Sequence, residues 1–134
     1  MVIDLIFKLL LSLFLAGLVG YEREKIHRAA GLRTHILVCL SSTLVTTASV
    51  LFPNTDPSRI PAAIITGIGF IGAGAILHSK GKVIGITTAA SLFFIACIGI
   101  VIGLSQYFLA IISTIIAYLI LIEGRKFKKI LGIR

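Results

Sequence analysis

Residues 83–103 read VIGITTAASLFFIACIGIVIG and contain no charged side chain. An apolar run of about 20 residues is long enough to cross the roughly 30 Å hydrocarbon core of a bilayer as a helix. Four further apolar blocks accompany it, at about 2–20, 36–52, 60–77 and 107–122. The five blocks predict an all-α integral membrane bundle of about five transmembrane helices. We expect one transmembrane domain over residues 1–124, followed by a basic cytoplasmic tail at 125–134.

The composition agrees with a lipid environment. Hydrophobic residues make up 57% of the 134 residues and charged residues only 13%, whereas soluble domains have roughly 45–50% and about 25%. A soluble chain this apolar would expose large hydrophobic patches and aggregate. Five spans leave only short connections within the 134 residues, so no separate soluble domain is expected.

The positive charge is distributed unevenly between the connections. Eleven of the thirteen Lys and Arg residues lie in the segments 21–35, 78–82 and 125–134, which five spans would place on one side. The opposite connections hold only Arg59. The positive-inside rule therefore predicts an outside N-terminus and a cytoplasmic C-terminus. The basic residues form short runs between apolar blocks with few aromatic residues, which favours lipid headgroups over nucleic acid as their partner.

No catalytic or metal-binding pattern is present in the sequence. Gly67, Gly69 and Gly72 match the spacing of a dinucleotide-binding loop, but no strand precedes them and no acidic residue follows at the required distance. Cys39 and Cys97 lie in apolar blocks and are interpreted as buried, inert thiols. We therefore predict that the protein is not an enzyme and needs no metal or other cofactor.

Small and hydroxylated residues indicate where helices pack. In membranes, small residues four apart allow two helix backbones to approach closely. This interpretation covers the residues Gly67, Gly69, Gly72, Gly74, Gly85, Thr87 and Thr88. A locally unwound helix whose carbonyls line a site is the alternative for 67–74.

Two further patterns indicate helix contacts. Gly99 and Gly103 have the four-residue spacing of close helix packing. Ser42, Thr46 and Ser49 form one polar stripe, which should face another helix rather than lipid.

The connection at 20–35 is the richest in charge. Glu24 and Arg28 have the spacing of a helical ion pair, Gly31 is expected to end the first helix, and Thr34 to help start the second. The segment is either a solvated turn that sets topology or a charged face on which a partner or headgroups dock. Its candidate functional residues are Glu22, Arg23, Glu24, Arg28, Arg33, Thr34 and His35.

A second connection carries the remaining candidates. Residues 53–59 contain two prolines and read as a loop. Asp56 before Pro57 predicts an N-cap followed by the first residue of the third helix. Asp56 and Arg59 are the candidate residues of this outer loop.

Four motifs, taken together and in order, resemble the core of the MgtC/SapB family. They are GYERE at 20–24, AGLRTH at 30–35, GIGFIGAG at 67–74 and GITTAA at 85–90. The resemblance implies a multi-pass protein of the bacterial inner membrane, linked to magnesium limitation and stress adaptation. It also implies regulation of other membrane proteins, such as the F-type ATP synthase. The chain departs from longer members, which carry an ACT-like domain after the last helix, and has Phe93 where many members have Trp.

Two functions from different classes follow. The first is a small membrane protein, expected to be a homo-oligomer, that regulates partner membrane proteins under magnesium limitation or acid stress. The second is a transporter or channel for Mg²⁺ or another cation. Mg²⁺ prefers oxygen ligands that include carboxylates, and all five acidic residues fall near the ends of the predicted spans, which favours the regulator. A purely structural subunit is a third possibility.

Overall fold

The computed structural model describes residues 2–50, 56, 58–79 and 82–130. It contains five helices: α1 (Val2–Lys25), α2 (Leu32–Ser49), α3 (Arg59–Gly74), α4 (Ile86–Gly103) and α5 (Tyr107–Ile130). A short antiparallel hairpin, β1 (Leu77–Ser79) and β2 (Lys82–Ile84), lies between α3 and α4. The predicted all-α bundle of five helices is confirmed, with the hairpin as an addition.

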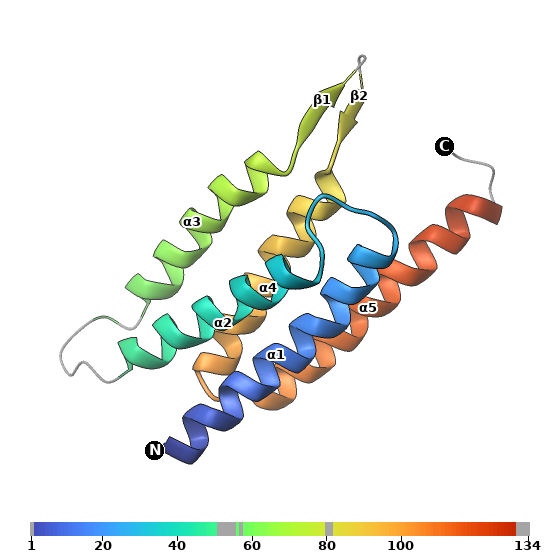
Figure 1. The fold of residues 1–134 in the computed structure, drawn as a ribbon. Helices are drawn as coiled ribbons and strands as arrows, with labels where there is room; N and C mark the ends of the chain where they lie inside the picture. The colour runs from blue at the N-terminus through green and yellow to red at the C-terminus, as the bar shows by residue number, and fades with distance from the viewer. Residues whose placement is uncertain (1, 51–55, 57, 80–81, 131–134) are drawn as a thin grey trace.

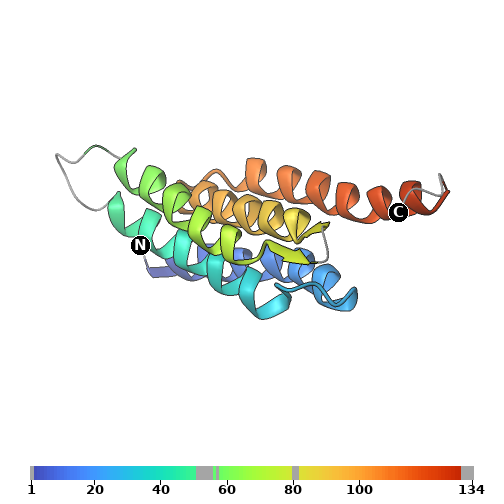
Figure 2. The ribbon, with the colours of Figure 1, turned by 90° about the horizontal axis from the view of Figure 1, so that it is seen from above.

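Helix α4 lies at the centre of the bundle and contacts each of the other four helices. Helices α1 and α2 pack against each other and against α4, while α3 and α5 lie on opposite sides (Figure 1). Seen from above, α1 and α2 lie along one side of the bundle and α5 along the other (Figure 2). The connection 26–31, the hairpin and the end of α5 lie at one end of the bundle, and the N-terminus lies at the other (Figure 1). The segments rich in positive charge therefore share one end.

The outer surface of the bundle is apolar. Ile3, Phe70 and Phe108 are 83%, 87% and 78% exposed, which water would penalise and lipid would not. In the described part of the chain, α1 and α4 are long and apolar enough to cross a membrane, and α3 is a shorter apolar helix. The surface and these helices define an all-helical membrane bundle.

The close approach of α2 and α4 depends on two glycines of α4. A Cβ added at Gly99 would lie 2.5 Å from the carbonyl oxygen of Cys39, and one added at Gly103 would lie 2.6 Å from the Cβ of Thr46. Ser42 and Thr46 are buried at this contact. The predicted packing of Gly99 and Gly103, and the predicted orientation of the α2 hydroxyl stripe toward another helix, are confirmed.

A chain of hydrogen bonds joins α1, α2 and α4 inside the bundle. The Ser12 and Thr43 hydroxyl oxygens are 2.7 Å apart, and the Thr43 hydroxyl donates to the Gly99 carbonyl oxygen at 3.1 Å. All three residues are buried. Polar groups are costly in an apolar interior unless they are hydrogen-bonded. We call this chain the polar seam.

A buried lysine closes the end of the bundle near the N-terminus. Lys8 Nζ donates to the Gly103 carbonyl oxygen at 3.0 Å and lies 3.3 Å from the Asp4 carboxylate. Asp4 and Lys8 lie four residues apart on one face of α1, the spacing at which a helical ion pair forms. The ammonium group also satisfies a carbonyl at the end of α4, where a cation is electrostatically favourable.

Two helices end on non-glycine residues in the left-handed region. His27 has φ of 52°, and the N–H groups of His27 and Arg28 donate back to the carbonyls of Glu24 and Arg23. This hydrogen-bond pattern is a Schellman motif. The prediction that Gly31 ends the first helix is therefore wrong, because the backbone of His27 already adopts the terminating conformation. Ser105, with φ of 63°, ends α4 in the same way.

The hairpin was not predicted from the sequence. We expected a helix to Leu77, a loop at 78–82 and a new helix from Val83, but α3 ends at Gly74 and α4 begins at Ile86. Gly85 precedes α4 with φ of +99°, and an added Cβ would clash with the Ala75 carbonyl oxygen. Only glycine fits this conformation and this approach, which identifies Gly85 as the junction between hairpin and helix.

Candidate functional site

The charged connection between α1 and α2 folds partly into the bundle. Glu22 and Arg23 are 4% and 2% exposed, and their charged groups lie 3.8 Å apart. Both residues sit in the last turns of α1, which runs on to Lys25 beyond the predicted end of the span. Charged side chains are rarely buried unless they are paired. Glu22 and Arg23 are therefore placed as internal groups rather than as part of an exposed face.

Glu24 connects the end of α1 to the start of α2. Its Oε2 accepts a hydrogen bond of 2.7 Å from the backbone N–H of Leu32, one of the donors that a helix start leaves unsatisfied. A Cβ on Gly31 would lie 2.7 Å from the same Oε2. Gly31 is the N-cap of α2 and has no side chain to supply this acceptor. The prediction that Thr34 starts the helix is wrong, because the carboxylate of Glu24 takes that role from across the connection.

His35 is fully buried and joins α2 to α4. Its Nδ1 lies 2.8 Å from the Gly31 carbonyl oxygen, and its Nε2 lies 3.0 Å from the Ser91 hydroxyl. A carbonyl can only accept, so Nδ1 carries a proton in this arrangement. Ser91 is also within hydrogen-bond distance of the Thr88 carbonyl oxygen, at 2.8 Å. Ser91 was not among the predicted site residues, because one serine in an apolar run gives no pattern.

The remaining residues of this site are accessible. Arg28 and Arg33 are exposed, and Thr34 is half-buried beside Arg33 at the start of α2. The structure thus divides the seven predicted residues into three groups. Glu22, Arg23 and His35 are internal, Glu24 forms the link to α2, and Arg28, Arg33 and Thr34 are at the surface.

The second candidate loop lies at the opposite end of α2 and α3. Asp56 Oδ1 accepts hydrogen bonds from the backbone N–H and the hydroxyl of Ser58, at 2.9 and 2.7 Å. These bonds lower the pKa of Asp56 below 3.8, because they favour the charged form. The N-cap of α3 is Ser58 and the helix begins at Arg59, so the predicted cap at Asp56 is wrong by two residues; Pro57 lies outside the described residues.

The glycine segment of α3 makes few contacts within the chain. Gly72 faces Ala89 of α4 at 3.6 Å, whereas Cβ atoms at Gly67, Gly69 and Gly74 would meet nothing within 4 Å. The helix is continuous to Gly74, which does not support a locally unwound site. A packing role for the three open glycines stays a prediction, and it requires another molecule.

The threonines after Gly85 differ in position. Thr88 is buried in the contact around Ser91, and Thr87 is exposed. Thr88 therefore lies at a helix contact within the chain, and Thr87 does not. In the described part of the chain, no three His, Cys, Asp or Glu side chains gather where they could hold a metal ion.

The sequence pattern of the MgtC family matches residues 9–130. Over 130 residues the chain is 38% identical to YhiD of Escherichia coli K12, whose name describes it as a candidate magnesium transporter; the match covers 90% of this chain and 60% of YhiD. It is 41% identical to the protein MgtC of Salmonella typhimurium LT2 over 83% of this chain and 48% of that protein. The protein MgtC of Brucella abortus is 39% identical over 78% of this chain and 44% of its own length. No solved structure matches the chain.

The fold and the surface thus define an all-helical membrane protein. With the match over residues 9–130, the chain belongs to the MgtC family. It spans about half the length of the curated relatives it matches.

Proposed function

We propose that this chain is a bacterial inner-membrane protein that regulates partner membrane proteins under magnesium limitation or acid stress, without itself conducting Mg²⁺. Its family and the names of its relatives support a link to magnesium. The charged end around Arg28 faces the cytoplasm in this proposal, as the distribution of positive charge favours. A homo-oligomer and a partner such as the F-type ATP synthase belong to the proposal as well.

The observation that carries the proposal is that oxygens of the polar seam inside the bundle are hydrogen-bonded to one another. The polar seam pairs Ser12, Thr43 and the Gly99 carbonyl with one another. A dehydrated Mg²⁺ demands near-ideal octahedral oxygen coordination, usually with carboxylates. The described carboxylates near the bundle ends are engaged too: Glu24 with Leu32 and Asp56 with Ser58. A conduit would have to break these contacts, and a regulator would not.

The accessible charges support docking of a partner at this end. Lys25 and Arg28 are exposed beside the buried pair of Glu22 and Arg23. A rigid, internally bonded support with exposed cations favours recognition of an acidic partner surface. The buried residues then hold the shape of the site, while the exposed cations make the contact.

The experiment compares exposed arginines at the two ends of the bundle. In cells that need the protein for growth at low Mg²⁺, the variant Arg28→Gln should lose the growth advantage while its amount in the membrane stays normal. Arg59→Gln, which removes an exposed arginine at the opposite end, is the matched control and should retain growth. Equal growth of the two variants would contradict docking at the charged end.

A further inference from the structure

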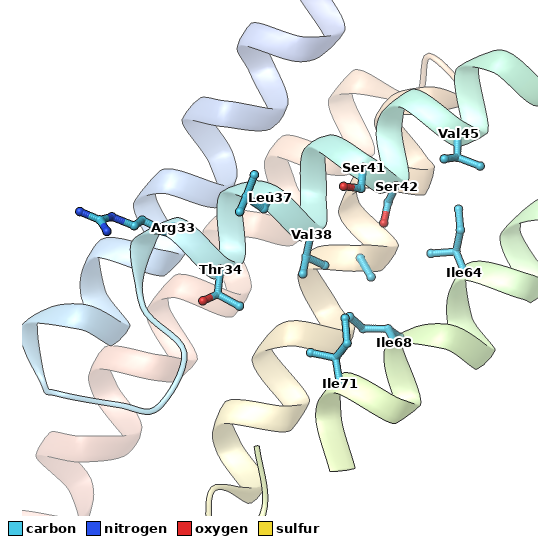
Figure 3. Close-up of a pocket in the computed structure, with 11 residues that line it drawn as sticks. Arg33, Thr34, Leu37, Val38, Ser41, Ser42, Val45, Ile64, Ile68 and Ile71 are labelled. Atoms are coloured by element: carbon cyan, nitrogen blue, oxygen red, sulfur yellow. The ribbon is translucent and has the colours of Figure 1, made fainter. Parts of the chain in front are cut away.

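A groove runs along the outside of the bundle between α2 and α3, with α4 as its floor. It has a volume of about 480 Å³. Figure 3 shows Val38 and Val45 of α2 across from Ile64 and Ile68 of α3. The walls are mainly aliphatic and the groove opens sideways, so in a membrane it opens to the lipid.

The ends of the groove differ in charge. Arg33 and Thr34 lie at the end near the connection 26–31 (Figure 3). Arg33 is exposed, and no carboxylate among the described residues forms an ion pair with it. A second hollow continues toward the opposite end, where Asp56 and Arg59 carry charges of both signs. Only the end at Arg33 combines an accessible cation with a neighbouring hydroxyl and no nearby acid among its lining residues.

The dimensions of the groove identify the kind of occupant. From Arg33 to Val45 the helix rises about 18 Å, close to the ~15 Å of hydrocarbon in one leaflet. The groove volume of about 480 Å³ exceeds the roughly 360 Å³ that an alkyl chain of about 20 Å² section fills over that length. A helix 10 Å across has a section of about 80 Å² and would fill roughly 1,400 Å³ over the same length, far more than the groove holds. Non-bonded carbons approach to about 4 Å, so an alkyl chain needs on the order of 20 Å².

We propose that the groove between α2 and α3 binds one acyl chain of an anionic phospholipid, with its phosphate at Arg33. Figure 3 shows the guanidinium at the first turn of α2, directed away from the aliphatic side chains of the groove, and we place the headgroup at this end. Guanidinium groups bind phosphate through paired charge-assisted hydrogen bonds. Basic pockets between membrane helices are a known basis of anionic-lipid recognition. This inference is independent of the proposed function.

The test is native mass spectrometry of the whole chain in detergent, titrated separately with dioleoylphosphatidylglycerol and dioleoylphosphatidylcholine. The wild type should bind the anionic lipid about fivefold more tightly, since one basic residue near a membrane surface contributes roughly this factor. Arg33→Gln should abolish the preference. Arg28→Gln is the matched control, because it removes the same charge from the same end of the bundle without lining the groove, and it should keep the preference.

A second pair of variants tests the groove itself. Ser41→Phe places a ring in the groove from an exposed position and should weaken binding of both lipids. Leu44→Phe, on the same helix but outside the groove, should not. Equal lipid preference in Arg33→Gln and Arg28→Gln would overturn the headgroup site. Unchanged lipid binding in Ser41→Phe would overturn the groove as a lipid site.

Discussion

The contact between α2 and α4 predicts a specific loss of stability in Gly99→Ala. The new Cβ would lie 2.5 Å from the Cys39 carbonyl oxygen, so an ordinary contact of 3.4 Å requires the helices to separate by about 0.9 Å. Overpacking of this kind costs about 1–3 kcal/mol. The hydrogen bond from Thr43 to Gly99 would also be lost, at roughly 0.6–1.7 kcal/mol, against a gain of about 1 kcal/mol in helix propensity. The net expectation is a destabilisation of roughly 0.6–3.7 kcal/mol.

The assay uses the buried thiol of Cys39. The chain contains no Trp, so unfolding in mixed micelles with increasing SDS is followed by the reactivity of Cys39 in a Cys97→Ala background. Gly67→Ala is the control, because nothing lies within 4 Å of its added Cβ, and its stability should be equal or higher. If Gly99→Ala unfolds at the same SDS fraction as Gly67→Ala, the proposed cause of the close helix contact is wrong.

Three further outcomes follow from the same geometry. Gly85→Ala should lower the thermal stability in detergent, since its left-handed backbone and the adjacent Ala75 carbonyl both exclude a side chain, whereas Gly69→Ala in open space should not. Glu24→Ala should destabilise the start of α2 by about 0.5–2 kcal/mol and speed hydrogen exchange at the Leu32 amide, while Glu24→Gln keeps an acceptor oxygen and should lose less. In a chain without its native cysteines, Ser58→Cys should react with an impermeant thiol reagent from outside and Arg28→Cys only after permeabilisation; the opposite pattern would reverse the orientation.

The helices could be predicted from the sequence because burial in lipid demands long apolar runs, and each predicted span overlaps an observed helix. Gly99 and Gly103 were predicted as packing positions because they lie four residues apart, and the structure places them against Ser42 and Thr46 of α2. The ends of the helices were harder to predict from the sequence. His27 and Ser105 end helices in a conformation for which glycine is the usual signal, so nothing in their residue type indicated the role.

The sequence predicted where the candidate site lies along the chain, but it did not predict that two of its charged residues are buried. Charged residues after a membrane helix are normally exposed, yet Glu22 and Arg23 fold inside because α1 continues past the predicted span and packs on α2. The partner of His35 lies 56 residues away at Ser91, and a single serine in an apolar run carries no periodic signal. The groove at Arg33 depends on the spacing of α2 and α3, which only the structure defines.

Mg²⁺ flux into sealed liposomes distinguishes a chain that regulates from one that conducts Mg²⁺. Purified protein is reconstituted with an internal Mg²⁺-sensitive dye, and external Mg²⁺ is then raised. We expect the same dye signal as in empty vesicles, because the polar seam of Ser12, Thr43 and Gly99 is closed by its own hydrogen bonds. Saturable Mg²⁺ entry that is lost in Thr43→Val would contradict the account and assign the chain as a transporter.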